Sequence, residues 1–313
     1  MLLHTPFRLS ICLKCDRFPG MPSKRLSILK TYKLFIGGKF PRTESGRTMT
    51  ATNPKTGEHF AHFCHASRKD LRDAVVAARK AQTGWAASSA YLRGQILYRL
   101  AEMLESRGSA FAEELCQSVG LSKVQAKKEV ETAVDRLVYF AGWTDKFTQV
   151  FGAINPVASS HFNFTIPEPS GVVGIFAPDS PSLLGFVSVV STAILSGNAV
   201  VVLASETNPL SAISFAEAVA TSDFPGGVIN ILTGKRKELA SWLAGHKDVN
   251  AVIDASGDHQ IFSELQSGSA VNLKRVSNHA CQSEVAWFGD ASQDPYRILD
   301  TLEFKTVWHP IGG

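Results

Sequence analysis

Two apolar runs about twenty residues apart dominate the hydrophobic pattern of the chain. They cover residues 172–177 and 199–203, are rich in β-branched side chains, and do not alternate with polar positions. Such runs are typical of strands that are buried on both faces, as in a parallel sheet covered by crossover helices. The residues between them have helical spacing and stop at Gly197-Asn198, so residues 171–206 predict a β–α–β unit. Ligands of such sheets bind beyond the carboxyl ends of the strands, here residues 178–181 and 204–206.

The segment before this unit predicts strands and then helices. Residues 33–40 indicate a strand, a tight turn and a strand, and residues 52–58 indicate a second turn. Ser67 can cap a helix that runs to Gln82, with Trp85 anchoring its far end. Three more helices are predicted at residues 90–107, 109–119 and 122–143, the last two with Ser109 and Ser122 as caps.

Residues 161–167 have a different pattern, in which Phe162, Phe164 and Ile166 alternate with polar neighbours. Alternation with a period of two predicts an extended strand with one apolar face. We therefore expect an arm that precedes the first core strand.

Composition excludes several classes of protein. The 313 residues are 44% hydrophobic, enough for one large or two ordinary domains. The net charge of +4 comes from 32 basic and 28 acidic residues spread along the chain, which argues against a nucleic-acid partner. No apolar run reaches the eighteen or so residues that cross a bilayer, so no membrane partner is expected. The five cysteines form no secreted framework, which favours a reducing, cytoplasmic setting.

The first thirty residues lack the pattern of a folded unit. Residues 1–20 are basic and have no clean apolar core or cleavage site, so they make a poor secretory signal. Cys12 and Cys15 have the spacing of half a zinc knuckle, but no second pair follows nearby, and we expect no metal site. We interpret residues 1–30 as a disordered extension, with Met21 as an alternative first residue.

Five motifs in order resemble the aldehyde dehydrogenase superfamily. Residues 51–85 contain NPKTGE followed by DLRDAVVAARKAQTGW, which is similar to the opening of that family. The later motifs are PSGVVGIFAP at 169–178, GNAVVV at 197–202, PGGVINILTG at 225–234 and VNAV at 249–252.

The resemblance implies an α/β fold, in which a Rossmann-like parallel sheet with flanking helices follows an N-terminal helical segment and carries a small β oligomerisation arm. We expect N-terminal strands and helices over residues 31–150, the arm over 151–168, the dinucleotide-binding-fold core over 169–289 and a C-terminal oligomerisation strand over 290–313. The family normally adds a separate catalytic domain, and this domain is missing between the core and the last strand.

The resemblance also implies a chemistry that can be checked residue by residue. Family members oxidise aldehydes with a thiolate nucleophile, an amide that stabilises the oxyanion, hydride transfer to NAD or NADP, and a carboxylate that activates water. The family's amide follows the first core strand, where this chain has Asp179 and Ser180. Ser180 could donate to an oxyanion, whereas Asp179 would repel it, and either residue could instead cap the next helix.

Two loops correspond to the family's dinucleotide contacts. Leu203 replaces a ribose-binding Lys, while Glu206 remains, either to accept from a ribose or to sit in the first turn of the following helix. At the pyrophosphate turn, Ser256 and Gly257 stand in reversed order between two aspartates, which weakens phosphate binding. The same residues are equally explained if Ser256 or Asp258 caps the next helix.

The remaining catalytic positions have also changed. His279 lies where the family's general-base Glu is expected, and it is either a base at neutral pH or a structural residue. Cys281 comes too early to be the family nucleophile, and no Cys follows it.

Two function classes compete on this basis. The first is an inactive subunit that forms a homo-oligomer, or a hetero-oligomer with a full-length aldehyde dehydrogenase, by strand addition. The second is an active oxidoreductase that uses NAD or NADP and either takes a thiolate from a partner chain or uses His279 and Cys281. We favour the first class.

Overall fold

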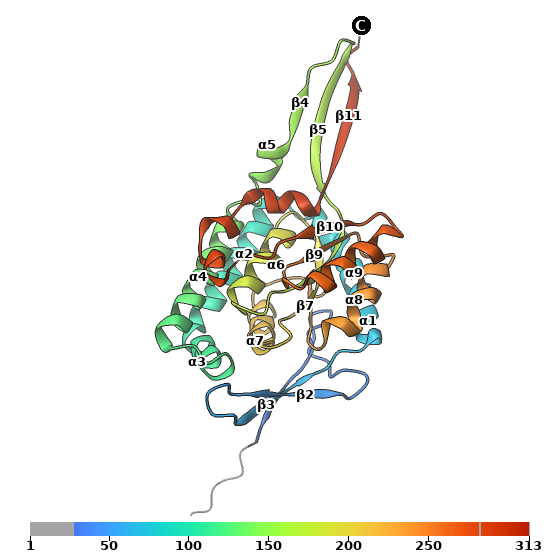
Figure 1. The fold of residues 1–313 in the computed structure, drawn as a ribbon. Coiled ribbons are helices and arrows are strands. Elements are labelled where there is room, and N and C mark those ends of the chain that lie inside the picture. The colour runs from blue at the N-terminus through green and yellow to red at the C-terminus, as the bar shows by residue number, and fades with distance from the viewer. Residues whose placement is uncertain (1–27, 282, 313) are drawn as a thin grey trace, which may run out of the picture.

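The computed structural model describes residues 28–281 and 283–312, so the predicted extension over residues 1–30 lies almost entirely outside the described residues. Its centre is a five-stranded parallel sheet in the order β10-β9-β6-β7-β8 (Figure 1). The strands are β6 (Val172–Phe176), β7 (Ala199–Leu203), β8 (Ile229–Leu232), β9 (Ala251–Asp254) and β10 (Arg275–Asn278). Strands β6 and β7 pair with Val172 opposite Ala199, and α6 (Leu184–Ile194) joins them. The predicted β–α–β unit is confirmed.

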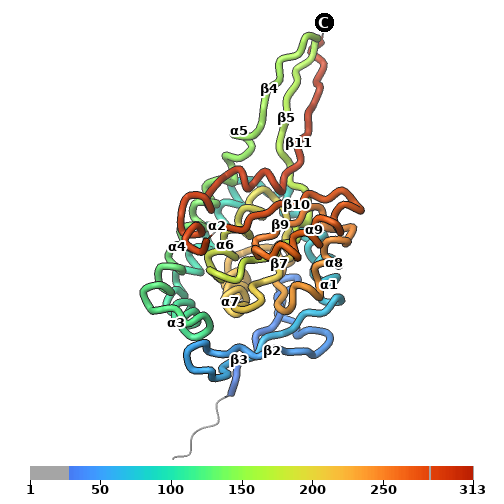
Figure 2. The backbone as a smooth tube through the Cα atoms, in the orientation of Figure 1, coloured from blue at the N-terminus to red at the C-terminus, as the bar shows by residue number. Residues whose placement is uncertain are grey.

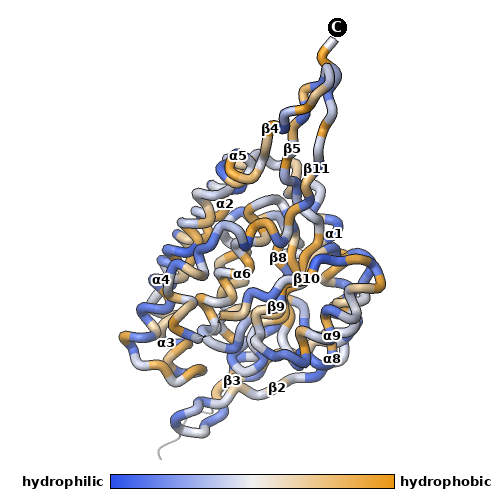
Figure 3. The backbone as a smooth tube through the Cα atoms, turned by 45° about the horizontal axis from the view of Figure 1, so that its top comes forward, coloured by the Kyte–Doolittle hydropathy of each residue, from blue (hydrophilic) through white to orange (hydrophobic). Residues whose placement is uncertain are grey.

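Helices cover both faces of this sheet. Side chains alternate along each strand, so Val172 and Phe176 enter one core while Val173 and Ile175 enter the other. One face packs against α1 (Arg68–Ala87), α8 (Arg236–Gly245) and α9 (His259–Ala270). The other packs against α6 and α7 (Leu210–Val219), with α2 (Ala90–Ser106), α3 (Gly108–Ser118) and α4 (Lys123–Ala141) outside them. Burial on both sides explains why β6 and β7 are apolar throughout. The hydropathy colouring likewise shows hydrophobic residues at the centre of the molecule near β8 (Figure 3).

A second sheet at the N-terminal end has the order β1-β3-β2. Its strands are β1 (Lys30–Tyr32), β2 (Thr48–Thr52) and β3 (His59–Cys64). The strand, tight turn and strand predicted for residues 33–40 are confirmed as a minimal hairpin, in which Ile36 and Lys39 form an antiparallel bridge around Gly37 and Gly38, whose φ values are 62° and 77°. Phe35 also pairs with the distant Ile231 of β8 through an isolated bridge. The backbone of this segment extends the edge of the central sheet.

Three of the four predicted N-terminal helices begin where the sequence indicates. Ser67 accepts from the Asp70 amide and Ser122 from the Gln125 amide, each within a reciprocal capping box. The prediction that Ser109 caps a helix is wrong. A single residue, Arg107, separates α2 from α3, so Ser109 already lies inside the first turn of α3.

A three-stranded antiparallel arm projects from the body of the molecule (Figure 2). After α5 (Phe147–Phe151), it consists of β4 (Ala153–Asn155), β5 (His161–Pro169) and β11 (Leu302–Pro310) in the order β11-β5-β4. Strand β11 pairs with β5 of its own chain, with Trp308 opposite Asn163. The extended arm and the terminal strand expected from the sequence are confirmed as strands.

Three short 3-10 helices carry the chain from β10 to β11: η1 (Glu284–Phe288), η2 (Asp290–Ser292) and η3 (Pro295–Thr301). Trp287 of this connection is buried, and the guanidinium of Arg136 on α4 donates to the Trp287 carbonyl oxygen over 3.0 Å. This connection is therefore packed onto the body.

Two kinds of feature are absent from the part of the chain that the structure describes. Among the described residues, no helix combines the length and the apolar character that a bilayer span requires. The same residues contain no group of three or more His, Cys, Asp or Glu side chains placed to hold a metal ion.

Candidate functional site

The sheet topology fixes where a ligand crevice should lie. From β6 the chain proceeds to β7 and β8 on one side, and then returns to place β9 on the other side of β6. A crevice forms at such a switch point, beyond the carboxyl ends of the strands. Here it lies between the ends of β6 and β9, and the loops that follow β7 and β8 form its wall.

An arginine from the helix after β8 fills this crevice. Arg236 is the first residue of α8, and its side chain is only 6% exposed. Its Nη2 donates to the carbonyl oxygen of Ala177, directly after β6, over 2.6 Å. Its Nη1 and Nη2 also reach Asp179 Oδ2 and Oδ1 at 2.8 and 2.9 Å, which is a bidentate ion pair.

Asp179 is the hub of this network. Burial alone would raise the pKa of Asp179, but the hydrogen bonds and charge of Arg236, aided by Ser205 and the Glu206 amide, lower it below its ordinary value. Asp179 Oδ1 accepts one hydrogen bond from Ser205 Oγ over 2.9 Å and another from the Glu206 amide over 2.8 Å. Asp179 therefore joins the loops after β6 and β7 to α8.

The expectation that Asp179 or Ser180 caps the following helix is wrong. Ser180 is exposed, and α6 begins only at Leu184 without a side-chain cap of its own. Instead, Glu129 Oε1 from α4 accepts from the amides of Leu183 and Leu184 at 2.8 and 3.2 Å. A carboxylate from a distant helix thus satisfies the start of α6.

Glu206 is also held by the protein itself. Its Oε1 accepts from Lys235 Nζ over 2.8 Å, and its Oε2 accepts from the Arg236 amide over 3.0 Å. Of the two alternatives for Glu206, the first turn of the following helix is wrong, because α7 begins only at Leu210 and the carboxylate serves the start of α8 instead. Leu203, at the end of β7, is 2% exposed and offers no donor beside it.

The expected pyrophosphate turn is a helix start with its own cap. Asp258 Oδ1 accepts from the Gln260 and Ile261 amides of α9 at 2.8 and 3.3 Å, so the capping interpretation is confirmed for Asp258. Ser256 donates its amide to Asp254 Oδ1 over 2.9 Å, while Gly257 is exposed at a φ of 75°. Burial raises the pKa of Asp254, and the charge of Arg236 opposes that rise.

His279 lies at the end of β10 and is 2% exposed. Its Nε2 forms a 2.6 Å hydrogen bond with Asp300 Oδ2 of η3, which ties the last connection to the sheet. Cys281 is a free thiol, and its Sγ accepts from Arg297 Nη2 over 3.6 Å. The bond to Asp300 agrees with the interpretation of His279 as a structural residue.

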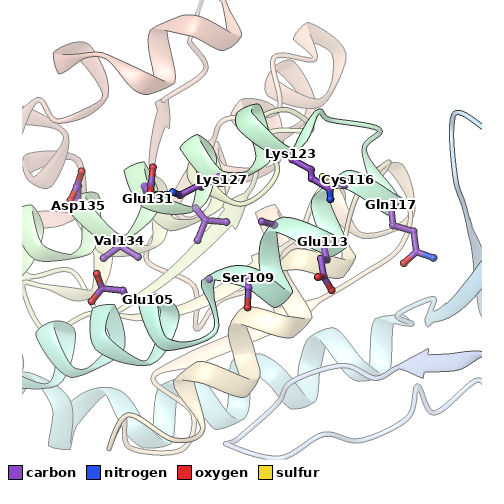
Figure 4. A pocket seen from close by; sticks show the side chains of 13 residues that line it. Glu105, Ser109, Glu113, Cys116, Gln117, Lys123, Lys127, Glu131, Val134 and Asp135 are labelled. Carbon is purple, nitrogen blue, oxygen red and sulfur yellow. Dashed lines mark ion pairs between the residues drawn. The ribbon is translucent and has the colours of Figure 1, made fainter.

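A separate groove of about 730 Å³ lies between α3 and α4 (Figure 4). Ala112, Val130 and Val134 form apolar parts of its lining, and none of the strand-end loops contributes to it. Lys127 and Glu131 on its wall form an ordinary surface pair of α4 at 3.5 Å. The groove is thus distinct from the crevice at the sheet edge.

Comparison with known proteins identifies the family. The family model described as "Aldehyde dehydrogenase family" matches residues 40–281. The chain belongs to the aldehyde dehydrogenase family. The resemblance expected from five sequence motifs is confirmed.

Relatives of the aldehyde dehydrogenase family match over most of this chain. Aldehyde dehydrogenase, cytosolic 1 of Elephantulus edwardii is 31% identical over 285 residues, which are 88% of this chain and 56% of the relative. Retinal dehydrogenase 2 of Gallus gallus is 33% identical and covers 82% and 50%. The structure of a Bacillus cereus aldehyde dehydrogenase in complex with NAD+ is 28% identical, with a TM-score of 0.76, and covers 80% and 51%. The chain spans about half the length of the relatives it matches.

A dinucleotide does not fit the residues of this aldehyde dehydrogenase family chain as they stand. The amides at the start of α9 are taken by Asp258, the Arg236 amide at the start of α8 is taken by Glu206, and the crevice holds a guanidinium. The amides of Arg236, Gln260 and Ile261, which a phosphate would otherwise reach, are thus already bonded within the chain.

Sequence reasoning missed Arg236, Glu129 and Asp300. Arg236 stands in a Lys-Arg-Lys run after Gly234, which looks like an ordinary basic helix start. Glu129 occupies an inward position of α4, among Ala126, Val130 and Ala133. A carboxylate on an apolar helix face is the one signal that could have identified it.

Proposed function

We propose that this chain is a catalytically inactive aldehyde dehydrogenase family subunit. It assembles through its arm, with a second copy or with an active full-length member of the family, in the cytoplasm. The observation that carries this proposal is the uncovered apolar face of the arm. The degenerate positions at the sheet edge and at His279 support the absence of catalysis.

The strand register defines that face. Phe162, Phe164 and Ile166 of β5 lie on the side of the arm that also carries Val307 of β11 and Ile154 of β4. Ile154 is 73% exposed and Phe162 is 43% exposed. An exposed apolar sheet face is typical of a surface that another chain covers. We call these five residues the arm face.

The free edge of the arm also supports assembly with another chain. Strand β11 is an edge strand of nine residues whose outer side pairs with no strand among the described residues. Such an edge accepts a strand from a partner through main-chain hydrogen bonds. Edge pairing and burial of the arm face would reinforce each other in an oligomer.

The chain between the sheet and the arm supports the lack of catalysis. In the family, a thiol-bearing domain lies between the last sheet strand and the terminal strand. Here residues 279–301 make that connection with the three short helices and a single cysteine, Cys281. Its neighbour His279 is buried and bonded to Asp300, so it is poorly placed to act as a base on an exposed substrate.

Turnover by the purified chain tests this proposal. Aldehydes of several sizes would be offered with NAD+ and with NADP+, with a full-length family enzyme as the positive control, and reduced cofactor would be followed by absorbance. We expect no turnover above the rate without protein, and retention of the chain by itself or by a full-length relative in pull-down. Turnover by the chain alone would overturn the proposal, and turnover that appears only when a relative supplies its thiol would support the active alternative.

A further inference from the structure

We infer that the guanidinium of Arg236, paired with Asp179, occupies the crevice and closes it to dinucleotides. The inference concerns the sheet edge alone and does not depend on assembly through the arm.

The position of the guanidinium carries the inference. Arg236 donates to the carbonyl oxygen that ends β6 and to Asp179 in the next loop, and its charge acts on Asp254 at the end of β9. These are the two strands between which the topology places the crevice. A cation therefore stands where a ligand of this fold would lie.

The space that remains is large enough for a ligand but has the wrong charges. A cavity of about 430 Å³ lies beside Arg236. Its lining includes four carboxylates, on Asp179, Glu206, Glu238 and Asp258, and three cations, on Lys235, Arg236 and Lys237. Most of the cations are already paired, since Lys235 bonds to Glu206 and Arg236 to Asp179. Glu238 is paired in turn with Arg47 at 3.0 Å. An incoming pyrophosphate would therefore meet cations whose charge is already largely neutralised.

Displacement of Arg236 by a ligand would be costly. Its side chain is 6% exposed, and its departure would leave Asp179 without a cation and the Ala177 carbonyl without a donor. Because the Asp179 side chain is 37% exposed, water would offset part of the lost ion pair, whereas the buried Ala177 carbonyl would lose this donor. The Arg236–Asp179 pair therefore stays formed, and the crevice stays closed, at ordinary dinucleotide concentrations.

Calorimetric titration of NAD+ and NADP+ into the full chain tests the inference. We expect no saturable heat for the unaltered protein at millimolar dinucleotide. The double variant Arg236→Ala with Asp179→Asn removes both charges together, so no unpaired carboxylate is left behind. We expect it to bind NAD+ at least about tenfold more tightly than the unaltered protein. The matched control is Lys235→Ala, which removes a neighbouring exposed cation and should leave binding absent.

A second measurement covers the case in which the double variant does not fold. The Arg236 Nε–H signal of the unaltered protein, assigned by its loss in Arg236→Lys, can be followed by NMR during an NAD+ titration. We expect no change in this signal. A saturable shift, micromolar binding by the unaltered protein, or a folded double variant that still binds no dinucleotide would each overturn the inference. Binding without turnover would overturn it and leave the proposed inactive subunit intact, whereas turnover would contradict that proposal.

Discussion

Glu129 accepts a 2.8 Å hydrogen bond from the backbone amide of Leu183, and α4 thereby supplies the cap that α6 lacks in its own sequence. The Leu184 amide donates to the same oxygen over 3.2 Å. Because Glu129 is 2% exposed, no water can easily replace it. This contact fixes α4 against the helix of the central β–α–β unit.

Removal of this cap should destabilise the protein. We expect Glu129→Ala to lower the free energy of unfolding by about 1–3 kcal/mol, because two buried amides lose their acceptor. Glu129→Gln is the matched control, since its amide oxygen can still accept from both groups. Urea denaturation followed by circular dichroism would measure both variants. Equal losses for Ala and Gln would contradict the capping role.

The same carboxyl group should make stability depend on pH. Burial raises the pKa of Glu129 above its ordinary value of 4.5, against the effect of its two backbone hydrogen bonds. The folded protein therefore binds this proton more tightly than the unfolded chain does. The stability that the group contributes is fully present below about pH 4.5 and is lost as the pH rises through the folded pKa.

Glu129→Gln does not titrate and should not show this loss. We expect the unfolding free energy of the Gln variant, relative to the unaltered protein, to improve as the pH is raised from 4 to 7. Denaturant titrations at several pH values would measure the difference. A difference that moves in the opposite direction would show that the two amides, and not burial, dominate the pKa of this carboxyl.

Local sequence patterns predict several elements of this fold but not the contact that Glu129 makes. The apolar runs of β6 and β7, the capping boxes at Ser67 and Ser122, and the alternation of residues 161–167 are local patterns, and each produced the predicted element. Glu129 and Leu183 are 54 residues apart, and only the packing of α4 on α6 brings them together. The spacing of residues along the chain therefore could not predict this contact.

The candidate site shows the same limit. The replaced positions Leu203, Ser180 and His279 could be identified by resemblance, and they indicated that the site had changed. The groups that now occupy the crevice could not be identified, because Asp179 and Arg236 are 57 residues apart. Within residues 33–40 the tight turn could be predicted locally, whereas the pairing of Phe35 with the distant Ile231 could not. Long-range pairing decided each of these outcomes.

His279 should behave as a structural residue. We expect His279→Ala to lower the free energy of unfolding by about 1–3 kcal/mol, because a buried side chain and its bond to Asp300 are lost. Asp300→Asn should cost less, since its side chain is 39% exposed and the amide can still bond to the ring. Thermal and chemical denaturation would measure both. Unchanged stability in His279→Ala would contradict this role and reopen the case for His279 as a base.

The arm face gives the clearest prediction for assembly. Ile154→Asp with Val307→Asp places two charges on that face, where a partner would have to bury them. Val124→Asp is the matched control, because Val124 is a 79% exposed valine of α4, outside the arm. We expect the double variant to dissociate and the control to remain assembled, with similar melting temperatures for both.

The solution mass of the full chain by size-exclusion chromatography with light scattering tests the central claim most directly. The chain has a mass of 33.9 kDa. We predict that the unaltered chain, alone or mixed with a full-length aldehyde dehydrogenase, elutes at a multiple of its mass or within the larger complex. The arm-face variant should elute as the monomer in both experiments. A monomeric unaltered chain that also fails to join a full-length relative would contradict the account.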